Sequence, residues 1–162
     1  MTLIRAAKII IALAVGLWGL TGLMGNLFGA LEVYSDVERV TSMAQVPEGE
    51  GPPWGTSSAF VVWMGVLAII LGKVAAIIAG IGGVLMAINL RANDTAFKDA
   101  KRLAVAGCGL AFAINFATFT IFAESIFFMF YTTNLTAVGE LAFRFTASFA
   151  LATLFIAQDE PT

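Results

Sequence analysis

The sequence has 162 residues, of which 59% are hydrophobic and 12% charged, and its formal net charge is −2. Soluble domains carry about 25% charged residues, so this composition predicts an integral membrane protein. The chain has no histidine and a single cysteine, Cys108. These counts exclude His-ligated haem or zinc, His-based acid–base catalysis, an internal disulfide and a cysteine-cluster metal site. We therefore expect no metal, no cofactor and no nucleic-acid partner.

The hydrophobic residues gather in four runs, each long enough for a helix to cross the hydrocarbon core, which takes about 20 residues. The first run, 9–31, follows Arg5 and Lys8. It is longer than the apolar part of a signal peptide, so we expect it to be retained. The other runs lie at 57–90, 103–123 and 135–156. The sequence thus predicts a single all-α domain, a bundle of four transmembrane helices, with run 57–90 either tilted or standing partly above the membrane.

The distribution of Lys and Arg predicts the orientation. Connection 91–102 carries four basic residues, whereas connection 32–56 carries five acidic residues and only Arg39. By the positive-inside rule, both termini and 91–102 lie in the cytoplasm and loop 32–56 in the periplasm of a bacterial inner membrane. Residues 31–45 favour an amphipathic or extended helix, and the Pro- and Gly-rich stretch that follows, 46–55, cannot be a helix. Trp54 is expected to anchor the chain at the membrane interface.

Small residues spaced by about one helical turn recur in the first three runs. Such residues let helix backbones approach closely in a membrane. The second run carries two adjacent stripes of them, so one stripe packs within the bundle and the other either does the same or docks a partner protein. The packing or partner positions are Gly25, Gly29, Gly72, Ala76, Gly80, Gly83 and Gly107.

Charged residues inside the runs are costly in lipid, so they face inward or find partners. Glu140 and Arg144 are four residues apart and pair along one helix face. Lys73 needs Glu124, Asn115 or a free carbonyl, or else its amine reaches toward the interface. Glu124 is also within reach of Arg144 if the third and fourth helices are antiparallel neighbours.

Three interpretations of these charges stay open: ion pairs that fix helix register, an ion path, or contacts with a partner subunit, a lipid headgroup or a quinone. The nearly apolar cytoplasmic half of the third and fourth runs weighs against the path. The candidate polar residues are Lys73, Glu124, Asn134, Glu140 and Arg144.

The second half of the chain carries a series of basic, aromatic and polar positions. They are Phe97-Lys98-Asp99-Ala100-Lys101, Gly107, Phe122, Glu124, Phe127, Met129, Asn134 and Ala142-Phe143-Arg144-Phe145. This series resembles the bacterial family of predicted small integral membrane proteins called domain of unknown function 2165. The resemblance implies four spans and recurring polar positions at Glu124, Asn134 and Arg144, but no substrate. The chain departs from that family in having Lys73 where an acid is usual, and Ser125-Ile126 where a Trp follows the glutamate.

Three functions of different classes follow. The first is a non-catalytic accessory subunit of a larger membrane complex, a respiratory complex being one candidate, with the lipid bilayer and other membrane subunits as partners. The alternative is a small oligomeric transporter or channel that uses the intramembrane charges. A membrane enzyme ranks last, because no nucleophile, acid and base converge in the sequence.

Overall fold

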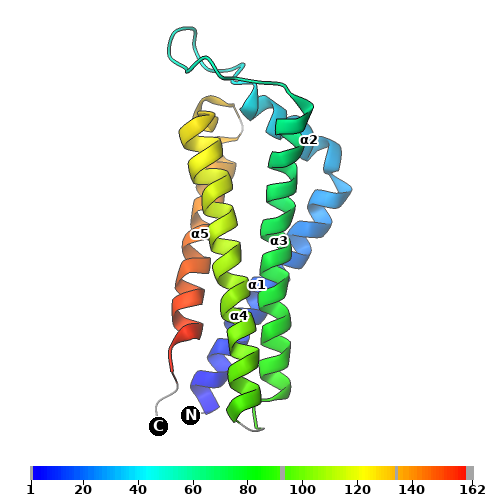
Figure 1. Ribbon diagram of the computed structural model, residues 1–162, viewed down its shortest axis with the longest axis vertical. Coiled ribbons are helices and arrows are strands. Elements are labelled where there is room, and N and C mark those ends of the chain that lie inside the picture. Colours follow the sequence, from blue (N-terminus) through cyan, green and yellow to red (C-terminus); the bar gives the residue numbers. More distant parts are fainter. Residues whose placement is uncertain (1, 92–93, 134, 160–162) are drawn as a thin grey trace.

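The computed structural model describes residues 2–91, 94–133 and 135–159. This part of the chain consists of helices joined by turns and by one long loop (Figure 1). Four of its helical stretches are long and apolar enough to cross a membrane, which confirms the all-α, four-span fold. The first and the last of the described residues lie at one end of the bundle, which we call the terminal end. The opposite end, with residues 29–58, 127–133 and 135, is called the loop end.

The elements follow one another without strands in the described part. They are α1 (Thr2–Phe28), α2 (Ala30–Thr41), α3 (Ala59–Ile88), α4 (Asp94–Asn115), the π-helix η1 (Phe116–Ile126), the 3₁₀-helix η2 (Met129–Tyr131) and α5 (Thr136–Ala157).

Two helices are longer than the expected spans. Helix α1 already begins at Thr2, and α4 with η1 runs from Asp94 to Ile126, although the expected runs were 9–31 and 103–123. The added turns of α4 are polar, and polar turns can remain helical above a membrane, so hydrophobicity alone does not mark where a helix ends. The chain leaves η1 through Phe128, which has a left-handed backbone with φ of 53°.

Helix α3 packs between α1 and α4, and in both contacts the backbones nearly touch. A Cβ added to Gly16 would lie 2.3 Å from the Cα of Gly80, and one added to Gly107 would lie 2.2 Å from the nitrogen of Ala79. Carbon atoms in ordinary contact are about 3.5–4.0 Å apart. Glycine is therefore required at these crossings.

The two predicted stripes of α3, Gly72-Ala76-Gly80 and Ala75-Ala79-Gly83, are both used within the chain, although the structure divides their residues differently. Ala76, Gly80 and Gly83 meet α1. Gly72, Ala75, Ala79 and Gly82 meet α4. Neither stripe is left over for a partner protein, so the idea that the second stripe is a docking surface is wrong.

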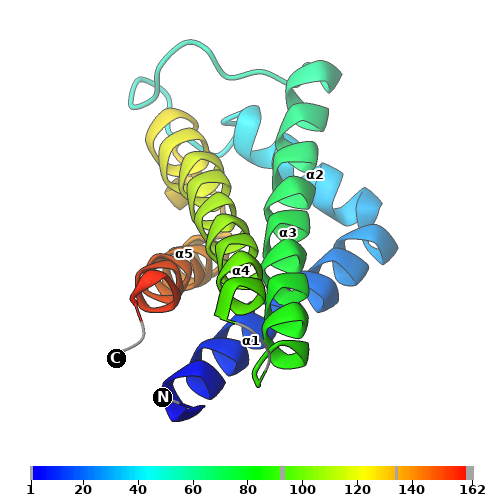
Figure 2. The same ribbon diagram turned by 60° about the horizontal axis from the view of Figure 1, so that its bottom comes forward.

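Gly25 and Gly29 do not pack against another helix of this chain, so the expectation that they pack within the bundle is wrong, and a contact with a partner stays a prediction. A Cβ on Gly25 would meet no atom within 4 Å. Helix α1 crosses α3 and then diverges from the bundle (Figure 2). The N–H of Gly29 donates to the carbonyl of Gly25 at 2.9 Å, where α1 ends and α2 begins. The two glycines therefore mark the end of α1.

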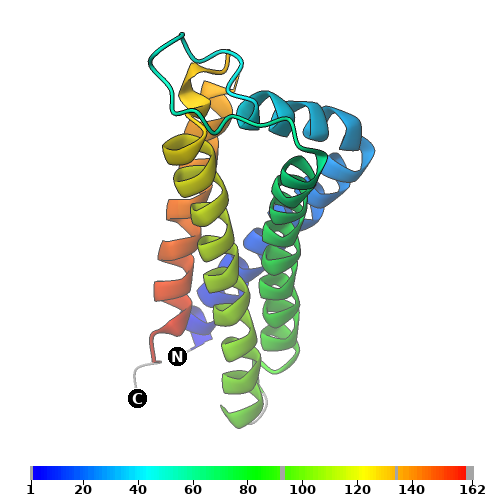
Figure 3. The ribbon, with the colours of Figure 1, turned by 45° about the horizontal axis from the view of Figure 1, so that its top comes forward.

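At the loop end, α2 lies across the bundle (Figure 3). The N–H of Thr56 donates to the carbonyl of Thr41 at 2.7 Å, and the indole N–H of Trp54 donates to the carbonyl of Ile126 at 3.1 Å. These bonds tie loop 42–58 to α2 on one side and to the end of η1 on the other. Trp54 thus connects the loop to η1, and about half of its side chain is exposed.

Candidate functional site

Lys73 lies at the middle of α3 and is held by an aromatic ring. Its ammonium is 3.3 Å from the centre of the Trp18 ring on α1. Its alkyl chain passes against Gly22, where an added Cβ would lie 2.9 Å from the Cε of Lys73. Among the residues that the structure describes, this ammonium forms no hydrogen bond or ion pair. A cation over a tryptophan face is attracted by the ring quadrupole, so Trp18 supplies the partner that the sequence left open.

Asn115, another expected partner of Lys73, is engaged elsewhere. The amide of Asn115 donates to the carbonyl of Ala111 in its own helix at 2.7 Å. Trp18 in turn contacts Phe145 and Phe149 of α5, with ring centroids 4.9 Å apart in each pair. Lys73 therefore belongs to an aromatic contact that joins α1, α3 and α5.

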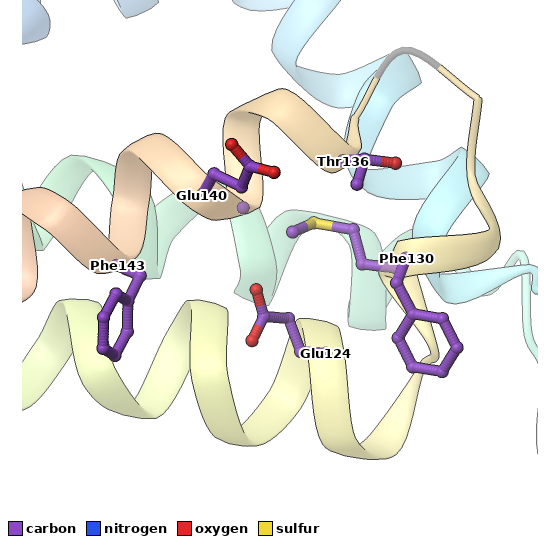
Figure 4. Close-up of a pocket in the computed structure, with 7 residues that line it drawn as sticks. Glu124, Phe130, Thr136, Glu140 and Phe143 are labelled. Atoms are coloured by element: carbon purple, nitrogen blue, oxygen red, sulfur yellow. The ribbon is translucent and has the colours of Figure 1, made fainter.

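A pocket of about 240 Å³ lies between η1 and α5 near the loop end (Figure 4). It is lined by Glu124, Met129, Phe130, Thr136, Gly139, Glu140 and Phe143. Glu124 reaches in from η1, whereas Glu140 lies at the edge of the pocket on α5, with its carboxylate turned away from η1. A Cβ on Gly139 would lie 2.8 Å from a carboxylate oxygen of Glu124, so this glycine makes room for the acid.

The outward side of α5 carries an ion pair. Arg144 lies 3.8 Å from Glu140, one turn away, and the two side chains are 73% and 67% exposed. At 1.5 Å per residue, they sit about 12 Å and 6 Å along the axis from Thr136, the first residue of this span. Both charges therefore lie within the length of the spanning helix and point away from the bundle.

The predicted polar residues thus fall into two separate groups. Glu124 and Glu140 line the pocket, and Glu140 also pairs with Arg144. Lys73 lies against Trp18 and takes part in neither the pocket nor the ion pair. Glu124 forms no ion pair with Arg144 in the described part of the chain. Asn134 lies outside the described residues.

The contacts that the sequence did not reveal join residues far apart in the chain. Besides Trp18 under Lys73, the hydroxyl of Tyr131 donates to a carboxylate oxygen of Glu50 at 2.7 Å. This hydrogen bond raises the pKa of Tyr131 above its usual value. No short-range pattern in the sequence links Tyr131 to Glu50, which lies 81 residues earlier in the chain. No group of three or more possible metal ligands occurs among residues 2–91, 94–133 and 135–159.

Comparison with known proteins identifies a family. A family model described as "Predicted small integral membrane protein (DUF2165)" matches residues 4–159. No curated protein and no solved structure matches the chain.

Proposed function

The chain belongs to this family of predicted small integral membrane proteins, and we propose that it serves as a non-catalytic accessory subunit of a larger membrane complex. The observation that carries the proposal is the ion pair of Glu140 and Arg144 on the outward side of α5. The proposal assigns this side of the helix to a protein contact.

The physical reason is the cost of charge in lipid. An ionised side chain at the centre of a transmembrane helix costs at least about 2.5 kcal/mol, and such residues nearly always face protein or water. Arg144 reduces this cost by extending toward the helix start, where Glu140 lies. The pair still faces outward with about two thirds or more of each side chain uncovered. A neighbouring subunit would shield both charges and offer them further polar partners.

The transport alternative has weaker support. It requires a polar cavity that joins Lys73 to Glu124 and Arg144. The pocket beside Glu124 includes neither basic residue, and Lys73 lies over Trp18. A path would therefore have to form between copies of the chain.

The proposal is tested by purifying the tagged protein from its own membranes in mild detergent and identifying what accompanies it by mass spectrometry. The wild type is compared with Glu140→Leu/Arg144→Leu. The matched control is Asp99→Leu/Arg102→Leu, which removes an exposed ion pair of 3.0 Å near the start of α4. We expect a different membrane protein at fixed stoichiometry with the wild type and the control, and its loss from the α5 variant. Subunits of a respiratory complex would appear directly in the spectrum.

Two results would contradict the proposal. One is a wild-type protein that purifies without any other protein. The other is an α5 variant that is folded, as judged by its helicity, and keeps the partner at the wild-type ratio.

A further inference from the structure

We infer that the outward side of α5 binds α5 of a second copy of this chain, so that two copies associate around a two-fold axis. The inference rests on the proposed function only in assigning this side of α5 to a protein contact. It adds the identity of the occupant.

The surface in question, called the α5 face, consists of six exposed residues. At 3.6 residues per turn they fall within about 100° of the helix circumference. They are Ala137, Glu140, Arg144, Ala147, Ser148 and Leu151. Helix α5 lies at the side of the bundle, and in the described part of the chain this face is covered by no other element (Figure 1).

The α5 face is complementary to itself. Glu140 and Arg144 lie on either side of its midline, about 40° apart around the helix. Two copies inserted in the same orientation place equal residues at equal depth. Because the two residues lie on opposite sides of the midline, a two-fold axis between parallel α5 helices brings Arg144 of each copy to the same side as Glu140 of the other, and the symmetric contact makes this pair twice. The result is a group of two acids and two bases with no net charge.

An unrelated helix would need an acid and a base at these depths and on matching sides. A second copy provides both by symmetry. Charge complementarity therefore favours the second copy over a partner of another sequence, for which the α5 face offers no distinguishing contact.

The residues around the charges permit a close approach. Ala137, Ala147 and Ser148 are small, and small residues let helix backbones come together in a membrane. Small residues likewise let α1 and α4 pack closely against α3 inside the chain. The hydroxyl of Ser148 already donates to the carbonyl of Arg144 at 2.9 Å. Covering it would therefore leave no unpaired donor.

This arrangement also fits the larger complex. Other subunits then contact the pair of copies, so that separating the copies through the α5 variant also releases them.

The test uses charge reversal in two differently tagged copies expressed together. Glu140→Arg makes the α5 face doubly basic, and Arg144→Glu makes it doubly acidic. We expect each variant alone to lose at least tenfold in capture of one tag by the other. We expect the two variants together to recover wild-type capture, because each face then meets its opposite. This recovery also shows that both variants are folded.

A covalent readout accompanies the capture. In a Cys108→Ala background, Ala147→Cys lies on the α5 face, and Leu67→Cys on α3 is the matched control. Oxidation of membranes with copper–phenanthroline joins two thiols into a disulfide only if their Cα atoms approach to about 7 Å or less. We expect a dimer band from Ala147→Cys and none from Leu67→Cys.

The outcomes separate this inference from the proposed function. If Ala147→Cys is joined only to a different protein, the second copy is wrong and the accessory role stands. If the copies associate but no other protein is purified with them, the second copy stands and the accessory role is wrong. Absence of both contacts overturns both. Single reversals that leave self-capture unchanged overturn the pairing.

Discussion

Replacing Gly107 by alanine is expected to destabilise the fold, even though alanine is the better helix former. The added Cβ would lie 2.2 Å from the nitrogen of Ala79, 2.7 Å from its Cα and 2.9 Å from the carbonyl oxygen of Ala75. All three are backbone atoms, so rotation of a side chain gives no relief. Helices α3 and α4 would have to separate by roughly 1.3 Å to restore an ordinary contact of about 3.5 Å.

The magnitude follows from two opposing terms. A gap of 0.5–1 Å already forfeits a quarter to a half of each contact energy, and overpacking a well-packed core costs about 1–3 kcal/mol. The glycine-to-alanine exchange itself returns about 0.5–1 kcal/mol in helix propensity. Because α3 and α4 meet along a long interface, we place the net loss for Gly107→Ala at about 2 kcal/mol.

Gly109→Ala is the matched control, because Gly109 lies two residues further along the same helix. There the nearest atom to an added Cβ is Cγ2 of Thr153 at 3.8 Å, which is an ordinary contact. We expect this variant to equal or exceed the wild type. Both are compared by the loss of helicity on heating in detergent, where about 2 kcal/mol corresponds to roughly 4–8 °C. Equal midpoints for the two variants would refute the claim that α3 and α4 touch at Gly107.

Two further predictions concern contacts between distant parts of the chain. Trp18→Leu should destabilise the protein more in the wild type than in a Lys73→Met background, and the difference should be about 0.5–2 kcal/mol, the energy of the ammonium–ring contact. A double-mutant cycle measures this difference, and a cycle without coupling would contradict the contact. For the loop end, the pKa of Tyr131 is raised by its hydrogen bond to Glu50, so the bond is fully present below the ordinary tyrosine pKa and is lost as the pH rises through the raised value. Ultraviolet titration of tyrosinate should therefore show Tyr131 ionising at lower pH after Glu50→Gln, and an unchanged titration would show that the two side chains do not meet.

Composition and local spacing predict the elements of this fold but not their meeting points. Run length is enough to find the four spans, and a spacing of four is enough to find the pair of Glu140 and Arg144. In contrast, Gly25 and Gly29 carry the same spacing signal as the glycines that do pack, yet they lie where α1 leaves the bundle. Which glycine meets a neighbour depends on where two helices cross, and that is set by the whole bundle.

The site was predictable to a similar degree. Lys73 was recognised as a residue in need of a partner, but that partner, Trp18, is reached only through the crossing of α1 and α3. The π-helical register of η1 also left no signal in the sequence, because its residues are as apolar as those of an ordinary span. That register ends at Ile126, just after Glu124, and so influences which way the acid faces.

At the terminal end, the beginning and the end of the chain meet at a single carbonyl group. The ammonium groups of Lys8 on α1 and Lys101 on α4 both donate to the carbonyl of Gln158, just after α5, and Lys8 is fully buried. During synthesis, this contact can form only after residue 158 has been made and α5 has entered the membrane. Shortening the chain before Gln158 would therefore remove an acceptor that α1 and α4 share through two buried lysines.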